Sequence, residues 1–221
     1  MIGRSACRLA RRLREDRGFS VIELSVAMIL SAMVSASLVA VFYAFSQNSS
    51  DATQRAVMQA DAREMIAEIT VQLRQAITAD LNGELVESLT ADRIVFYTTN
   101  YDTLSPERVE YERADCIEGL CELWVYRYAM VSSDGIAYTF AAEPFESSFL
   151  FGGVLADQPV FQGVDWVGDP AARSTIASCS FTGTECTFPI VAITIRVRPP
   201  TATEGASAPL TLHEEVRMRN A

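Results

Sequence analysis

The residues of this chain that could do chemistry begin with a junction and a single carboxylate near the N-terminus. Gly18 and Phe19 stand where a basic segment changes to an apolar one, and Glu23 is the only charged residue between Phe19 and Phe45. Hydrolysis of the peptide bond between Gly18 and Phe19 would free an amine about one helical turn from Glu23. An ammonium and a carboxylate at that spacing can pair, within one chain or between neighbouring chains. The pattern therefore indicates processing at this junction, with the new amine as an ion-pair partner.

The five cysteines are the second group that could do chemistry. Cys7 lies in the basic segment, and the others form two close pairs, Cys116 with Cys121 and Cys179 with Cys186. An even number of cysteines outside a membrane is typical of disulfides, although the sequence allows more than one connectivity. Because short loops close at a small entropy cost, we expect pairing within each close pair. Zinc is the alternative, but zinc sites favour tighter cysteine spacings and add histidines.

The remaining polar groups form no recognisable catalytic set. His213, the only histidine, lies in an expected strand beside two glutamates, and we interpret it as an exposed strand residue. No nucleophile elbow, P-loop or dinucleotide-binding fingerprint occurs. Glu110, Glu112 and Asp115 lack the spacing of a calcium loop, so we expect a solvated acidic face there. The sequence therefore predicts a protein that is not an enzyme and that holds no cofactor or metal.

The segment from Leu24 to Phe45 must position Glu23. It has 22 residues without charge, glycine or proline, and a helix of about 20 apolar residues crosses a bilayer core. The first 18 residues carry six arginines and two acids, a net charge of +4, which keeps that flank in the cytoplasm. A secretory signal would place its cleavage site behind the apolar segment instead. We expect a single-pass protein of the inner (cytoplasmic) membrane with its N-terminus in the cytoplasm.

A helical pattern continues beyond the apolar segment. Apolar residues recur at steps of three and four along Met58, Ala62, Met65, Ile69, Leu73 and Ile77. This spacing predicts an amphipathic helix that ends near Asn82-Gly83, with a break at Asn48–Asp51 as the alternative. We therefore expect four segments: a leader (1–18), a membrane-spanning half of the helix (19–46), an amphipathic half (47–82) and an extracytoplasmic β-rich domain (83–221).

Beyond residue 84 the pattern is typical of strands. We expect strands at 93–98, 108–113, 122–128, 136–140, 190–197 and 210–218. A turn at Asp134-Gly135 joins two of them, and the region 143–189 reads as irregular loops with a short strand near 160–167. Trp124, Tyr126 and Tyr128 share one strand face, which we expect in the core or at a subunit contact. The fold class expected is α+β, a long N-terminal helix packed on an antiparallel sheet.

Net charge argues against one class of partner. The chain of 221 residues has a net charge of −10, so the part beyond the basic leader carries −14. A domain this acidic is a poor candidate for general binding to nucleic acid phosphates. We therefore predict no nucleic acid partner for the domain, while a role in a DNA-uptake machine stays open.

The N-terminal pattern resembles that of type IV prepilins and of the pseudopilins of type II secretion. In that family a basic leader ends in glycine, the mature chain begins with phenylalanine or methionine, and a glutamate stands at its fifth position before about twenty apolar residues. Here these are Gly18, Phe19 and Glu23. The resemblance implies cleavage and N-methylation at Phe19 by a prepilin peptidase and a pilin-like fold.

The C-terminal part resembles the J-type minor pseudopilin and its counterparts in type IV pili. The matching features are Trp166, Pro189 followed by the strand 190–197, and the ending Arg217-Met218-Arg219-Asn220. The region 169–187 departs from this pattern because it is long and contains the second cysteine pair. That departure leaves the subtype open.

Together these features predict a minor pilin or pseudopilin, a structural subunit of a type IV pilus or a type II secretion-like filament. Its partners would be other pilins or pseudopilins, met through the N-terminal helix with Glu23, and the prepilin peptidase. The subunit would be stored in the membrane and then enter an extracytoplasmic filament. The alternative is a signal-anchored extracytoplasmic binding module that does not polymerise.

Overall fold

The computed structural model describes residues 20–78, 85–100, 104–133, 138–165, 174–180, 189–198 and 208–218. The chain divides into two units, Met1–Thr53 and Gln54–Ala221. One helix and eleven strands occur in the described ranges. They are α2 (Val21–Arg74), β1 (Val86–Leu89), β2 (Arg93–Thr99), β3 (Pro106–Ile117), β4 (Leu120–Ser133), β5 (Tyr138–Phe140), β6 (Glu146–Leu155), β7 (Phe161–Asp165), β8 (Ser174–Ile176), β9 (Cys179–Ser180), β10 (Ile190–Val197) and β11 (Leu210–Arg217).

The long helix α2 belongs to both units. Residues 48–51 are helical, so the break considered at Asn48–Asp51 does not occur. The helix ends at Arg74, earlier than the Asn82-Gly83 end that the sequence suggested, so that prediction was wrong. The physical reason is that the amide of Ile77 donates to the carbonyl of Tyr97 in β2, 2.9 Å away, and so does not continue the hydrogen bonding of the helix. Asn82 and Gly83 lie outside the described residues.

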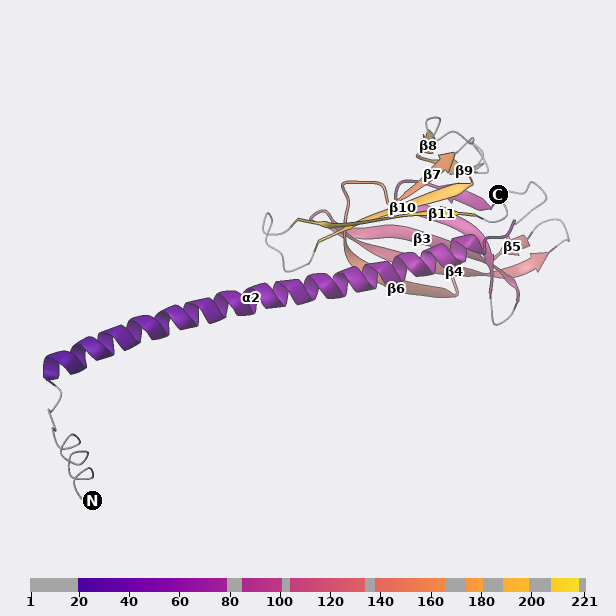
Figure 1. Cartoon of the computed structure of the whole chain (residues 1–221). Helices are drawn as coiled ribbons and strands as arrows, with labels where there is room; N and C mark the ends of the chain where they lie inside the picture. The colour runs from indigo at the N-terminus through magenta and orange to yellow at the C-terminus, as the bar shows by residue number, and fades with distance from the viewer. Residues whose placement is uncertain are drawn as a thin grey trace, which may run out of the picture. The chain divides into compact units, whose positions relative to one another are not determined.

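The strands form one curled antiparallel sheet, shown in Figure 1. Among the described residues its order is β8-β7-β10-β6-β4-β3-β2-β1-β9, with β11 on the second edge of β10 and β5 on β4. β3 and β4 form a tight hairpin through Glu118 and Gly119, both with positive φ. This backbone conformation matches the right-handed twist of the flanking strands.

The core lies between the second part of α2, residues 54–74, and one face of this sheet. The helix contributes buried Ala62, Met65, Ile66, Ile69 and Leu73, and the strands contribute residues such as Phe96, Val109, Tyr111, Leu123, Val125 and Ile193. Alternate residues of a strand point to opposite faces, which places these side chains together on the side that α2 covers. The expected α+β class, with a long N-terminal helix on an antiparallel sheet, is confirmed.

The sequence prediction missed β6, which lies inside the region 143–189 that we expected to be irregular. Serines and the Gly152-Gly153 pair suggest a loop, but β6 pairs with β4 along most of its length, with two irregularities in register. Gly153 has φ of 77°, and a Cβ there would lie 2.7 Å from the carbonyl oxygen of Arg198. The glycine therefore allows β6 to approach the end of β10 closely.

The other strand predictions were largely correct. The expected strands at 93–98, 108–113, 122–128, 190–197 and 210–218 correspond to β2, β3, β4, β10 and β11. β5 pairs with β4 as the hairpin prediction required, whereas its turn at Asp134-Gly135 lies outside the described residues. The short strand expected near 160–167 is β7. Trp166, Arg219 and Asn220 also lie outside the described residues.

Candidate functional site

Glu23 stands at the start of α2 and has a partner within its own chain. The Ser20 amide donates to Glu23 Oε2 at 3.2 Å, and the Ile22 amide donates to Ser20 Oγ at 3.3 Å. Ser20 is thus the N-cap residue and Glu23 the third helical residue of a capping box, which satisfies two otherwise unpaired amides. A carboxylate in the first turn also interacts favourably with the helix dipole.

We did not predict this capping box, although Ser20-Val21-Ile22-Glu23 is a Ser-x-x-Glu signature. The spacing of Glu23 from the Gly18–Phe19 junction had drawn attention to the new amine instead. Gly18 and Phe19 lie outside the described residues, so the pairing of the Phe19 amine stays a prediction. A capping glutamate uses one oxygen for the Ser20 amide, which leaves lone pairs for a second, charged donor.

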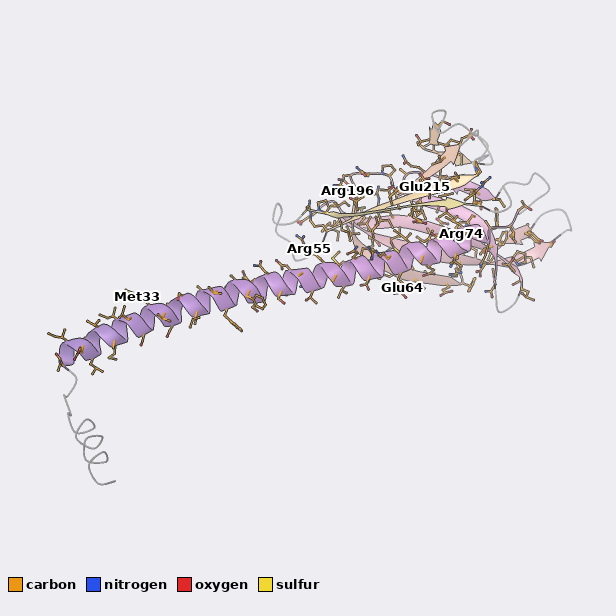
Figure 2. All side chains as sticks on the ribbon, viewed as in Figure 1. Met33, Arg55, Glu64, Arg74, Arg196 and Glu215 are labelled. Carbon is orange, nitrogen blue, oxygen red and sulfur yellow. A yellow bond between two sulfur atoms is a disulfide. The ribbon has the colours of Figure 1, made fainter. Side chains whose placement is uncertain are left out.

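The apolar part of α2 exposes its whole circumference. Every residue from Val21 to Thr53 is exposed, including Leu24, Leu30, Met33 and Phe45, and Figure 2 shows side chains such as Met33 projecting from all sides of this part of the helix. The helix is long and apolar enough to span a membrane. Two of its serine hydroxyls bond to the helix backbone: Ser25 Oγ donates to the Val21 carbonyl and Ser37 Oγ to the Val34 carbonyl. Such a surface needs lipid or apolar partners around it.

Two polar contacts hold the second part of α2 on the sheet. The hydroxyl of Tyr111, which is fully buried, donates to Gln72 Oε1 at 2.9 Å. Arg127 of β4 lies 3.6 Å from Glu68 of the helix and 2.9 Å from the buried Glu107 of β3. Because buried polar groups are costly unless paired, these bonds fix which face of the helix meets the sheet.

The face of the sheet away from this core carries a compact ion-pair cluster. Arg108 donates to both oxygens of Glu87, at 2.6 and 3.1 Å, and lies 4.6 Å from the centre of the Tyr128 ring. Glu110 accepts from the Tyr128 hydroxyl at 3.1 Å and pairs with Arg93 and Arg108. Charges balance within this cluster, which indicates a structural role and not a vacant ligand site.

The cluster corrects one sequence prediction. We expected Glu110, Glu112 and Asp115 to form a solvated face, but Glu110 is only 5% exposed. The expectation was wrong for Glu110 because Arg93 of the neighbouring strand β2 joins Arg108 of its own strand in pairing with it, and the pairing of β2 with β3 is not visible in the local sequence. Asp115 is exposed as expected.

The cluster also shifts two pKa values. Burial by itself would raise the pKa of Glu87, but the hydrogen bonds from Arg108 and Tyr97 and the charge of Arg108 outweigh burial and lower it. For Arg108, burial acts to lower the pKa, and the hydrogen bond and charge of Glu87 reverse that effect and raise it. Each group therefore stabilises the charged form of the other.

A pH dependence of stability follows for Glu87. Because its pKa is lower in the folded chain than the ordinary 4.5, its stabilising effect is complete above that value and is lost as pH falls through the folded-state pKa. Urea unfolding of the full chain in detergent micelles should show Glu87→Gln less stable than wild type at about pH 7, with a smaller difference at about pH 3. Glu143→Gln, at an exposed carboxylate, is the control. A Glu87→Gln deficit of equal size at both pH values would contradict the assignment.

The cysteine prediction is confirmed for one pair. Cys116 and Cys121 form a disulfide that closes the β3–β4 hairpin. Cys179 in β9 is also disulfide-bonded. Its predicted partner, Cys186, lies outside the described residues, so the Cys179–Cys186 bond stays a prediction.

His213 lies in β11 and is about half exposed. Its Nδ1 lies 2.8 Å from Thr194 Oγ1, and its Nε2 lies 3.4 Å from Glu215 Oε1. Its position agrees with the expected exposed strand residue. In the described part of the chain, no group of three or more His, Cys, Asp or Glu side chains is arranged to hold a metal ion.

Trp124, Tyr126 and Tyr128 of β4 are half-buried and lie outside the core, so the expectation of a core position was wrong, and a subunit contact stays a prediction. The indole of Trp124 meets Phe149 of β6 edge to face, with ring centres 5.7 Å apart, and donates to Glu122 at 3.0 Å. Tyr128 takes part in the ion-pair cluster around Arg108. These contacts make the aromatic row part of the sheet's structure.

Comparisons with protein-family models, with curated proteins and with solved structures find no match to this chain.

Proposed function

We propose that this protein is a minor pilin or pseudopilin, a non-enzymatic structural subunit of a type IV pilus or of a type II secretion-like filament. One observation carries the proposal. A single helix, α2, has a first part whose apolar residues are all exposed and a second part with an apolar stripe that lies in a domain core. A membrane-stored subunit that later packs its helix against neighbouring helices uses both parts.

Assembly would bury the exposed apolar part of α2 among the corresponding helices of other subunits. Glu23, the only charged residue between Phe19 and Phe45, would accept from the Phe19 amine of an adjacent subunit while it also caps its own helix. A charge left unpaired in a lipid-like environment is costly, so this pairing would favour one axial position of each subunit over others. The pilin-like character of the fold belongs to this proposal.

The leader charge supports an orientation with the N-terminus in the cytoplasm and the β-rich domain outside. The disulfide between Cys116 and Cys121 supports the same orientation, because disulfides persist in oxidising compartments. After processing, the domain would face outward on the filament.

The alternative function is a signal-anchored extracytoplasmic binding module that does not polymerise. The capping box favours this alternative to some extent, because it gives Glu23 a local role that needs no neighbouring subunit. Processing between Gly18 and Phe19 distinguishes the two candidate functions, since a signal-anchored module keeps its leader.

We expect a prepilin peptidase, co-expressed with the chain, to remove the first 18 residues. Replacing Gly18 by leucine should reduce this conversion by about tenfold or more, because a bulky side chain would stand where the peptidase meets a bare backbone. The control is Gly3→Leu, a substitution within the leader but far from the junction. Intact mass spectrometry of the membrane fraction measures the conversion, and undiminished conversion of the Gly18 variant would contradict processing at this bond.

A further inference from the structure

Strand β11 has one edge that pairs with β10 and one that faces outward. The pairing with β10 covers the whole strand, and the amide of Met218 donates to the carbonyl of Pro189. In an antiparallel ladder the hydrogen-bonded residues alternate, so the backbone groups of Thr211 and His213 point away from β10. Within the residues that the structure describes, no other strand pairs with β11.

A groove runs between this outer edge and the second part of α2. One cavity of about 470 Å³ is lined by the helix from Arg63 to Arg74 and by Leu212, His213 and Glu214 of β11. A second cavity of about 320 Å³ is lined by Arg55, Met58 and Gln59 of the same helix, by Val197 at the end of β10 and by residues 208–210 at the start of β11. The two cavities follow one helix and one strand, which makes the groove long enough for an extended segment.

The helical wall of the groove is basic. Arg55, Arg63 and Arg74 line it, and none forms an ion pair with a residue in the described part of the chain. Figure 2 labels Arg55 and Arg74 along this part of α2. Glu68 of the same helix instead pairs with Arg127 of β4. On the opposite side of the groove, β11 contributes one carboxylate, that of Glu214. The groove therefore has a net positive charge in a protein whose overall charge is negative.

Thr70 of α2 is a buried polar residue beside the larger cavity. Its side chain is only 7% exposed and lines the larger cavity. Its hydroxyl oxygen has no hydrogen-bond partner among the described residues. Buried hydroxyls without a partner are rare in folded proteins, so the contact between this part of α2 and the sheet is left incompletely satisfied beside the cavity.

We propose that this groove binds an extended acidic segment of a partner polypeptide, which adds to the sheet as a strand beside β11. The backbone of the segment would bond to Thr211 and His213, as in other sheets that recognise peptides through an edge strand. Its carboxylates, on one face by the two-residue period of a strand, would meet Arg63 and Arg74. Edge strands with free backbone groups invite such pairing. Glu214 would repel a carboxylate placed beside it, so the carboxylates of the segment would have to face the arginines of α2. The proposal does not depend on filament assembly.

The test uses the full chain in detergent micelles and a fluorescent peptide of about four Thr-Glu repeats, which places all glutamates on one strand face. Fluorescence anisotropy should show saturable binding that weakens with added salt. A matched peptide with lysine in place of glutamate should bind about tenfold more weakly or worse. A glutamate peptide with N-methylated backbone amides should also bind about tenfold more weakly, because its amides cannot donate to the strand edge.

Variants of the chain locate the site. Combined Arg63→Gln and Arg74→Gln should weaken peptide binding by about tenfold. His213→Pro should also weaken binding by about tenfold through loss of an outward amide, because it leaves the backbone bonds to β10 in place and removes only the side-chain contact with Thr194. The control is Arg196→Gln, at an arginine of β10 that pairs with Asp157 away from the groove. Unfolding midpoints close to wild type would show that each variant is folded.

Three results would overturn the proposal. They are absence of saturable binding up to about 1 mM peptide, equal binding of the plain and N-methylated peptides, and binding that the two arginine substitutions do not weaken. Self-association that His213→Pro abolishes, without peptide binding, would replace the acidic partner by a second copy of this chain.

Discussion

Replacing Glu23 by alanine is expected to leave the amount of chain in the membrane unchanged and to lower its incorporation into filaments by about tenfold or more. Insertion is preserved because alanine makes the helix more apolar. Assembly is impaired because the Phe19 amine of a neighbouring subunit would be buried without its carboxylate. The measurement compares membrane level, protease resistance of the domain and incorporation into sheared filaments for the variant and wild type.

Two further variants separate the pairing role of Glu23 from its capping role. Glu23→Gln keeps a side-chain acceptor for the Ser20 amide but removes the charge, so it should assemble as poorly as Glu23→Ala. Ser20→Ala removes the N-cap hydroxyl but keeps the charge, so it should assemble far better than either. Normal assembly of Glu23→Gln would limit the glutamate to helix capping. Loss of Glu23→Ala from the membrane would indicate a role in insertion and favour the anchor.

Replacing Leu73 by alanine is expected to destabilise the domain by about 2–5 kcal/mol. Leu73 is fully buried in the core between α2 and the sheet. Truncation removes its apolar contacts and leaves a cavity, and for a domain of this size we expect the unfolding midpoint to fall by about 2–4 °C for each kcal/mol.

Leu38→Ala is the matched control, since it makes the same substitution in the same helix at a residue that is 64% exposed. In detergent micelles, the thermal unfolding midpoint of the domain should be the same for Leu38→Ala and wild type. Equal destabilisation by the two variants would contradict the division of α2 into an exposed part and a core-forming part. A Leu73→Ala domain as stable as wild type would show that the helix contributes little to the core.

The sequence predicted much of the fold where local patterns are strong. The strand at 190–197 matches β10 residue for residue, because a run of β-branched residues between proline-rich ends has few alternatives. The buried stripe of α2 was likewise predicted by apolar spacing, and Ala62, Met65, Ile69 and Leu73 are all in the core. These features depend on the period of apolar residues, which a single sequence records directly.

The features that the sequence did not reveal depend on contacts between distant segments. β6 contains serines and a glycine pair that suggest a loop, and its strand form depends on pairing with β4. The end of α2 at Arg74 is set by a bond between Ile77 and Tyr97, and the burial of Glu110 depends on arginines from two strands. The capping role of Glu23 was readable from Ser20 and was missed because processing seemed sufficient to explain the glutamate.

The N-terminal residue of the chain in purified filaments tests the central claim most directly. Sheared filaments from cells that make this protein with its own assembly machinery would be digested and analysed by mass spectrometry. The proposal predicts that the chain is present in the filament fraction and that its first residue is N-methylated Phe19. A chain that is absent from filaments and retains its first 18 residues in the membrane would contradict it.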